Sequence, residues 1–223
     1  MPRSKDRVLR DLAEVIDPSH TALIVVDVQN DFVSNDGFIA RFGLDVSDMQ
    51  AAIPRINDFI RVCRATGVPV IYLREVIAEK TVLPNFLALF GDFENIAVRE
   101  GTWGAEFYQE LLPPEAGERV VVKPCYDGFE DTNLDVTLRS LGVQTCLYAG
   151  FASNVCVEAT ARHGFVKGYY SVLLSDATGA ATPDEHTACE RVFKVFYGPV
   201  VRTDEIAAVW DKAGIRGLAT ATI

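Results

Sequence analysis

Six short and almost uninterrupted apolar runs restrict the fold of this chain more than any other feature. Segments with helical spacing of apolar residues separate them. The runs cover residues 21–29, 68–75, 119–124, 144–150, 170–176 and 198–203. Strands that are apolar without alternation are buried on both faces, which is typical of a parallel sheet covered by helices. We therefore predict an α/β fold, a single doubly wound domain with a six-stranded, mostly parallel sheet and helices on both faces.

Apolar spacing and capping residues predict the helices. Ile53, Ile56, Ile60 and Cys63 recur every three or four residues, and Pro54 indicates that their helix begins near it. Between residues 75 and 119 the pattern is poor, which predicts short helices and a long loop at the active site. Further helices are predicted near 104–112, from the cap at Thr132 to Gly142, over 153–167, from the cap at Thr182, and over 204–213.

The main domain is predicted to span residues 19–214. A helical extension over 1–18 precedes it and a tail over 215–223 follows it. The chain has 223 residues, which is enough to bury a large core without disulfides. No linker, repeat or low-complexity stretch divides it, so one domain is expected.

Charge and hydropathy exclude several classes of partner. The net charge is −10 and there is no basic block, which argues against nucleic acid and against an anionic membrane surface. No apolar run approaches the roughly 18–20 residues of a membrane span. The first residues lack the apolar region of a secretory signal, so a cytoplasmic location is expected. Five cysteines without Cys-x-x-Cys spacing are expected to be reduced thiols.

Three residues at the ends of predicted strands form a candidate catalytic group. Asp27 closes the first strand, Lys123 closes the third, and Cys156 begins a helix just after the fourth. In a doubly wound sheet the carboxyl ends of central strands meet, and ligands bind there. A helix N-terminus favours a thiolate and can bind an oxyanion. An acid could then move the thiol proton while a lysine keeps that acid ionised and oriented.

Spacing alone leaves other interpretations open for these three residues. An aspartate at a strand end is often a helix cap or an ion-pair partner. A buried cysteine is more often a packing residue, and a lysine after a strand is usually solvated. Cys125, two residues after Lys123, could point into a pocket or away from it.

Three motifs in order resolve these alternatives. They are ALIVVDVQNDF at 22–32, KPCYDGFEDTNLD at 123–135 and GFASNVCVEATARHGF at 150–165. Together they closely resemble the isochorismatase-like cysteine hydrolase family, over about residues 20 to 210. Within it, the segments after Lys123 and around Cys156 are most similar to ureidoacrylate and biuret amidohydrolases, with N-carbamoylsarcosine amidohydrolase as a further relative.

The resemblance implies the chemistry and its residues. It implies a catalytic triad of Asp27, Lys123 and Cys156, and a cis peptide bond between Phe151 and Ala152. The N–H groups of Ala152 and Cys156 would then form an oxyanion hole. We therefore expect hydrolysis of a C–N amide bond in a small ureido or carbamoyl compound, through a thioester and without a cofactor.

The departures from the family pattern also predict absences. Nicotinamidases of this family carry an Asp/His/His metal site, and none of His20, His163 and His186 lies in the corresponding region. We therefore predict no metal. Isochorismatase itself hydrolyses a vinyl ether without the cysteine, so Cys156 argues against that reaction.

Residues near the motifs are candidates for binding the substrate. Arg74 could bind a carboxylate, or could pair with Glu75 or another acid. Asn30 and Asn154 could orient a polar substrate or cap turns. The aromatic candidates, which could instead only pack loops, are Phe32, Trp103, Tyr126 and Phe129.

The substrate and the assembly stay open at this point. An amidase of a nicotinamide or maleamate analogue is one alternative activity, and a non-catalytic binding or scaffold protein on the same fold is another. The intact triad argues against the scaffold. A homo-oligomer, either a dimer or a tetramer, is the expected assembly.

Overall fold

The computed structural model describes residues 8–214, so the predicted tail over 215–223 and residues 1–7 of the predicted extension lie outside the described residues. Six strands form one sheet in the order β3-β2-β1-β4-β5-β6, and every pairing is parallel. The predicted α/β fold is confirmed. The strands are β1 (Thr21–Val26), β2 (Val70–Glu75), β3 (Arg119–Lys123), β4 (Thr145–Phe151), β5 (Tyr170–Gly179) and β6 (Val200–Val201).

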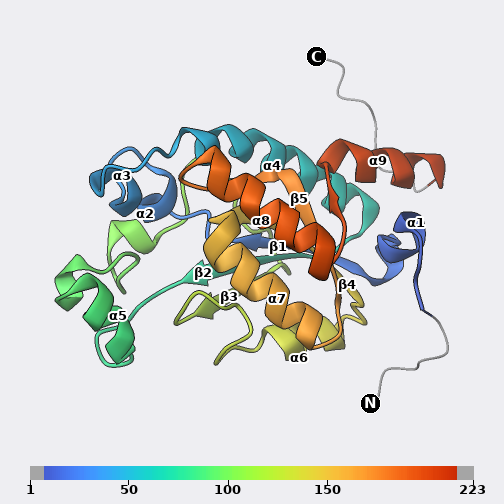
Figure 1. Cartoon of the computed structure of the whole chain (residues 1–223). Helices are drawn as coiled ribbons and strands as arrows, with labels where there is room; N and C mark the ends of the chain where they lie inside the picture. Colours follow the sequence, from blue (N-terminus) through green and yellow to red (C-terminus); the bar gives the residue numbers. More distant parts are fainter. Residues whose placement is uncertain (1–7, 215–223) are drawn as a thin grey trace.

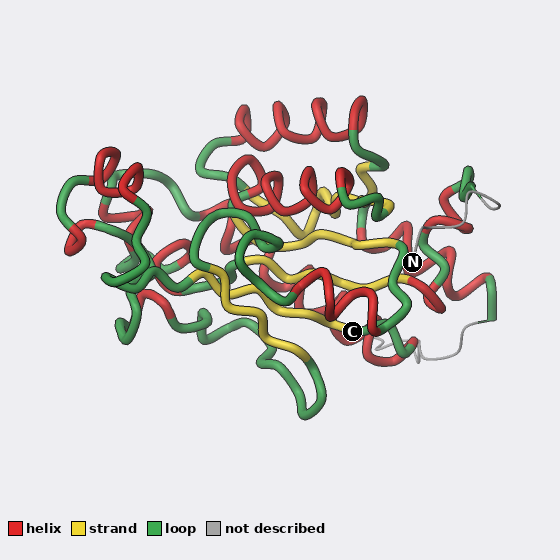
Figure 2. Tube along the Cα trace, turned by 90° about the horizontal axis from the view of Figure 1, so that it is seen from below, coloured by secondary structure: helices red, strands yellow, loops and turns green. Residues whose placement is uncertain are grey.

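Helices cover both faces of the sheet (Figure 1). On one face lie α4 (Ser47–Thr66) and α9 (Thr203–Lys212), and on the other lie α6 (Leu134–Ser140), α7 (Glu158–Val166) and α8 (Pro183–Phe196). Figure 2 shows the strands side by side between these helices. Side chains alternate along each strand, so one strand supplies both core layers.

Shorter helices lie at the ends of the sheet. In Figure 1, α2, α3 and α5 gather at one end and α1 lies at the opposite end. Within residues 8–214, no helix combines the length and the apolar character needed to cross a bilayer. The short helices are α1 (Leu12–Val15), α2 (Asn30–Val33), α3 (Phe38–Arg41) and α5 (Pro84–Phe90). There are 3₁₀ turns at Pro18–His20, Phe93–Asn95 and Trp103–Ala105.

Pro54 does not begin the helix that contains it, which corrects the prediction. The helix α4 begins at Ser47, so Pro54 lies in its interior. Proline removes one backbone hydrogen bond there and crowds the preceding turn. Its position is exposed, while Met49, Ile53 and Ile56 on the opposite side are buried. Burial of that apolar side outweighs the lost hydrogen bond.

The helix predicted near residues 104–112 is also absent. Trp103–Ala105 form one 3₁₀ turn, and the backbone beyond it pairs with the segment after β1. Asn30 N–H donates to the Glu106 carbonyl at 3.0 Å, and Tyr108 N–H donates to the Val28 carbonyl at 2.9 Å. These long-range hydrogen bonds use groups that a helix would need. They also place residues 103–108 beside the start of α2.

The strand order reverses at β1, so a crevice opens between β1 and β4. Val26 pairs with Leu73 of β2 on one side and with Gly150 of β4 on the other. Gly150 has φ +107°, and a Cβ there would lie 1.9 Å from the Val26 carbonyl oxygen. Glycine is therefore required for β4 to approach β1 this closely. Ligands of doubly wound folds bind beyond such a crevice.

Candidate active site

Three strand ends bring a buried lysine between two carboxylates. Asp27 follows β1, Glu75 ends β2 and Lys123 ends β3. The Lys123 Nζ lies 2.7 Å from Asp27 Oδ2 and 3.3 Å from Glu75 Oε2. It also donates to the Cys125 carbonyl at 2.8 Å. Since Lys123 is fully buried, it is not a solvated strand end.

Cys156 joins this group from the segment after β4. It lies in a π-helical turn, Ser153–Val157, that continues into α7. Its Sγ donates to Glu75 Oε2 at 3.5 Å, and one atom each of Cys156, Asp27 and Glu75 lies within 4.8 Å of the others. The structure thus places Asp27, Lys123 and Cys156 in one cluster.

Thr160 and Gly128 connect the second and third sequence motifs behind Cys156. Thr160 Oγ1 donates to the Cys156 carbonyl at 2.7 Å and accepts from the Gly128 N–H at 2.9 Å. A Cβ at Gly128 would lie 2.5 Å from Leu73 Cδ1 and 2.9 Å from Thr160 Cγ2. A larger residue at 128 would therefore separate the loop after β3 from α7, which carries Thr160.

The backbone of Asp27 has a left-handed conformation, with φ +49°. Aspartate tolerates this region better than most residues other than glycine. The Asp27 N–H still donates to the Leu73 carbonyl at 3.1 Å, so the chain turns directly after its last sheet hydrogen bond. One carboxylate oxygen then accepts from the Glu75 N–H at 3.1 Å, and the other faces Lys123.

Glu75 and Gln29 belong to this cluster, although sequence reasoning did not propose them as site residues. Gln29 Nε2 donates to the carbonyls of Glu75 and Ala105, each at 2.8 Å, and its Oε1 accepts from the Glu75 N–H at 2.8 Å. The amide therefore fixes the backbone that carries Glu75. The sequence position of Glu75 could have identified it as a site residue, since Glu75 ends its strand as Lys123 does.

Burial and charge set the protonation of the cluster. Burial, with repulsion from Glu75, raises the pKa of Asp27 to about 7, although Lys123 opposes this rise. Burial also raises the pKa of the Cys156 thiol well above its usual value, again against Lys123. Burial disfavours the charge of Lys123, but Asp27, Cys156 and Glu75 outweigh it and raise the pKa of Lys123. The resting site therefore holds a protonated thiol beside an ammonium.

The peptide bond between Phe151 and Ala152 is cis, as the family resemblance implies. The Ala152 carbonyl accepts hydrogen bonds from the N–H groups of Val155, at 3.1 Å, and Val157, at 3.2 Å. Ala152 and Cys156 both line the same pocket.

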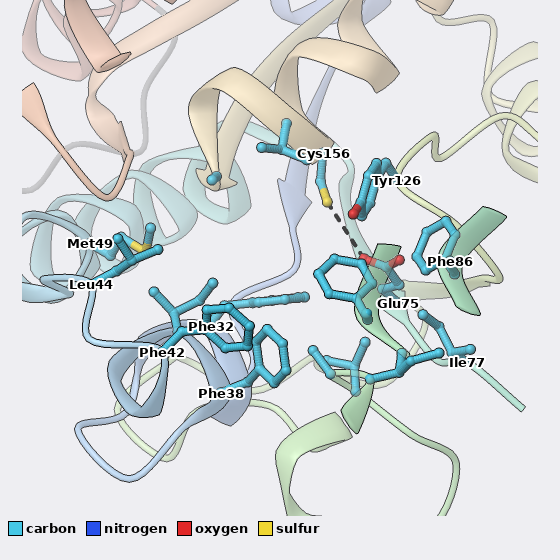
Figure 3. A pocket seen from close by; sticks show the side chains of 17 residues that line it. Phe32, Phe38, Phe42, Leu44, Met49, Glu75, Ile77, Phe86, Tyr126 and Cys156 are labelled. Atoms are coloured by element: carbon cyan, nitrogen blue, oxygen red, sulfur yellow. Dashed lines mark hydrogen bonds between the residues drawn. The ribbon is translucent and has the colours of Figure 1, made fainter. Parts of the chain in front are cut away.

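That pocket, of about 220 Å³, opens over the Cys156 thiol (Figure 3). Glu75, Cys156 and Tyr126 contribute its polar side-chain groups. Burial raises the pKa of Tyr126 to about 12, so its hydroxyl stays protonated. Six of its 17 described lining residues are aromatic, namely Phe32, Phe38, Phe42, Phe86, Phe90 and Tyr126.

Two of the proposed substrate-binding residues, Phe32 and Tyr126, line this pocket. Asn30 instead donates to the Trp103 carbonyl at 2.8 Å, and Trp103 lines a neighbouring cavity. Asn154 is not among the lining residues. Cys125 also lies outside the lining, and its thiol contacts the Asp127 carbonyl at 3.9 Å.

The side chains of Arg74 and Phe129 do not line the pocket. Adjacent residues of a strand point to opposite faces, so Arg74 cannot follow Glu75 into the site. Arg74 lies 3.4 Å from the Glu106 carboxylate instead. Phe129 is buried in the core, where its ring stacks on Tyr169 at 5.9 Å.

The described residues around the pocket do not fit a divalent metal. Asp27, Glu75 and Cys156 could offer ligand atoms, but the Lys123 ammonium already lies against both carboxylates and would repel a cation. None of the three histidines lines the pocket. His163 contacts Asp127 outside the pocket, at 2.5 Å.

Comparisons with known proteins agree with the fold. The isochorismatase domain model matches residues 21–205. Ureidoacrylate amidohydrolase RutB of Methylobacterium radiotolerans is 36% identical over 92% of this chain and 84% of its own. A cysteine hydrolase from Pseudomonas syringae pv. phaseolicola matches with a TM-score of 0.81 and 27% identity, over 94% of this chain and 100% of its own.

A third relative is the N-carbamoylsarcosine amidase of Thermoplasma acidophilum. It has a TM-score of 0.68 and 28% identity, over 83% of this chain and 97% of its own. The domain match and these relatives, together with the α/β fold, assign the chain to a class of hydrolases. The chain belongs to the isochorismatase family, which confirms the resemblance found in the sequence.

Proposed function

We propose that this protein is a metal-free cysteine amidohydrolase that cleaves a C–N bond of a small ureido or carbamoyl compound. The observation that carries the proposal is the buried ion pair of Asp27 and Lys123, whose Oδ2 and Nζ atoms lie 2.7 Å apart. It lies beside a cysteine thiol that lines a pocket. The named relatives that act on ureidoacrylate and N-carbamoylsarcosine support this substrate class.

The first step is attack by Cys156 on the substrate carbonyl. The pKa of the thiol is raised by burial, so Sγ needs a base when it attacks. Asp27 accepts the thiol proton, because its own pKa of about 7 suits proton exchange near neutral pH. The new S–C bond forms as the carbonyl π electrons move onto oxygen, where the N–H groups of Ala152 and Cys156 bind the oxyanion.

The leaving group departs in the second step. Asp27 returns its proton to the substrate nitrogen, the C–N bond breaks, and ammonia or an amine leaves a thioester on Cys156. Glu75 lines the pocket and its buried Oε1 lacks a hydrogen-bond partner among the described residues, so this oxygen accepts from the amide N–H groups.

Water completes the cycle. Asp27 takes a proton from a water molecule, whose oxygen attacks the thioester carbon. The C–S bond then breaks and Asp27 passes this proton to Sγ, which restores both the Cys156 thiol and the Asp27 carboxylate. The product is an acid, or a carbamate that can lose carbon dioxide. Lys123 Nζ lies 2.7 Å from Asp27 Oδ2, so it is a positioning residue that orients Asp27 and balances its charge.

A screen for ammonia release tests this proposal. Its substrates are ureidoacrylate, biuret, N-carbamoyl amino acids, nicotinamide and simple amides, assayed with the protein and with Cys156→Ser. Turnover of a ureido or carbamoyl compound that requires Cys156 is expected. Turnover of none of them would exclude the amidohydrolase and favour a non-catalytic protein.

Chelation is expected to leave the activity unchanged. The described carboxylates at the site already share the Lys123 ammonium, so no metal is required there. The measurement is ammonia release before and after EDTA and dialysis. A reproducible loss that added zinc or manganese restores would show that the site binds a metal.

Activity is expected to fall as the pH decreases below about 7, because protonated Asp27 cannot accept the thiol proton. Negative charge on Glu75 raises the pKa of Asp27, so Glu75→Gln is expected to move the inflection of kcat/KM to lower pH. Both profiles are measured by ammonia release. An inflection that stays in place in Glu75→Gln would argue that Asp27 is not the titrating base.

The homo-oligomer, a dimer or a tetramer, and the cytoplasmic location remain predictions. Size-exclusion chromatography with light scattering measures the oligomeric state directly.

A further inference from the structure

The pocket over Cys156 is lined almost entirely by apolar side chains. Among its described lining residues, none is a lysine, an arginine or a histidine. The charged group that reaches it is the Glu75 carboxylate, which repels an anion. A substrate carboxylate buried in this pocket would be strongly unfavourable, since neither water nor a cation would compensate its charge. The wall is therefore unsuited to a substrate with an acidic tail.

Two arginines that precede lining residues in the sequence, Arg41 and Arg74, contact acidic side chains. Arg41 lies 3.7 Å from the Asp31 carboxylate, and Arg74 lies 3.4 Å from that of Glu106. Arg41 and Arg99 line the neighbouring cavity, not this pocket. Phe38, Phe42, Phe90 and Ile96 line both cavities, so these side chains form the boundary between them.

A continuous series of rings forms the wall. Phe42 contacts Phe38 at 5.0 Å between ring centroids, Phe38 contacts Phe90 at 6.1 Å, and Phe90 contacts Phe86 at 6.1 Å. Phe86 then contacts Tyr126 at 5.0 Å. Figure 3 shows Phe38, Phe42, Phe86 and Tyr126 around the space in front of Cys156. Such a surface binds apolar groups by burial and aromatic groups also by ring contacts.

The size of the pocket suits one such group. An apolar cavity of roughly 150 Å³ accommodates benzene. The volume of about 220 Å³ here therefore accommodates a phenyl or a branched alkyl group together with the amide.

We propose that the substrate is an uncharged urea or carboxamide whose aromatic or branched aliphatic substituent lies against these rings, and not a ureido acid. This inference rests on the proposed function, because it names the substrate class of that same site. The amide would face Cys156 and Glu75, and the substituent would extend toward Phe38 and Phe42.

An isosteric pair of ureas tests the charge directly. Isopentylurea and β-ureidopropionate differ in that an isopropyl group replaces the carboxylate, so size and chain length are matched. We expect kcat/KM for isopentylurea to exceed that for β-ureidopropionate by about tenfold or more, because the unpaired charge must be desolvated. Benzylurea is expected to be a substrate of the same class.

A charge placed in the wall provides the second measurement. Phe42 is 66% exposed, so the fold tolerates Phe42→Arg, which puts a cation at the pocket. The preference for isopentylurea is expected to fall about tenfold or more in this variant. Leu89→Arg is the matched control, since Leu89 is 72% exposed and lies outside the pocket lining. It is expected to keep the wild-type preference.

Binding to Cys156→Ser separates failure of this inference from failure of the proposed function. Tighter calorimetric binding of isopentylurea than of β-ureidopropionate to this variant supports the inference even if the wild-type protein hydrolyses neither compound. The amidohydrolase is overturned only if the compounds of the ammonia-release screen are not hydrolysed either. Equal or better binding and turnover of β-ureidopropionate overturns the inference while Cys156-dependent hydrolysis stands. Binding of neither compound overturns the inference as well.

Discussion

Cys156→Ser is expected to abolish turnover, with a loss of roughly four orders of magnitude or more, as for other enzymes that lose their nucleophile. A serine hydroxyl is a far weaker acid and a weaker nucleophile than a thiol, so transfer of its proton to Asp27, with a pKa of about 7, is much less favourable. The fold is expected to persist, because the hydroxyl can donate to the Glu75 carboxylate that the thiol contacts at 3.5 Å. The measurements are ammonia release and thermal unfolding.

Cys125→Ser is the matched control for that experiment. Cys125 is a second thiol near Lys123, but it does not line the pocket and is only half-buried. Its variant is expected to turn over at nearly the wild-type rate. Near-normal activity in Cys156→Ser, together with a loss in Cys125→Ser, would transfer the role of nucleophile to Cys125.

Lys123→Met is expected to lower kcat by about 10²–10⁴-fold or more, comparable to loss of a general acid–base group. Methionine keeps most of the volume but removes the charge that holds down the pKa of Asp27. Asp27 would then remain protonated at neutral pH, so the inflection of the pH profile is expected to move to higher pH. KM is expected to change less than kcat, because Lys123 does not line the pocket.

Stability must be measured in the same variant. Removing one partner of a buried ion pair costs about 3–5 kcal/mol, so Lys123→Met should unfold at a lower temperature. Adding Asp27→Asn replaces the carboxyl group that has lost its partner and should restore part of that stability without restoring activity. Lys123→Arg should also be slow, since a planar guanidinium does not occupy the position of an ammonium. Normal turnover and thiol alkylation in Lys123→Met would remove Lys123 from the mechanism.

The positions of Asp27 and Lys123 follow from the sequence for a topological reason. Solid apolar runs indicate a parallel sheet, and parallel strands place their carboxyl ends at one edge. The residue that ends or follows each run is therefore a candidate for the site. Glu75 meets the same criterion, but its sequence position suggests only a partner for Arg74. Strand alternation separates these neighbours, and only the observed register shows which of them faces Cys156.

The pocket wall could not be inferred in the same way. Phe38 and Phe42 come from α3 and its end, and Phe86 and Phe90 come from α5, in segments without a clear pattern. Their meeting depends on how two long connections fold over the sheet edge. Trp103 and Phe129 are equally reasonable candidates by proximity to the motifs, yet the chain directs them to a neighbouring cavity and to the core.

Sequence alone determined the fold class, the family, and the acid, lysine and cysteine of the site, because each depends on local patterns repeated along the chain or on motifs in order. Tertiary structure decided which other residues join them. Glu75 and Gln29 enter through strand register, and Pro54 stays inside α4 because burial of the opposite side outweighs one hydrogen bond. The apolar character of the pocket also depends on the tertiary structure, because its side chains are far apart in the sequence and come into contact only when the long loops pack.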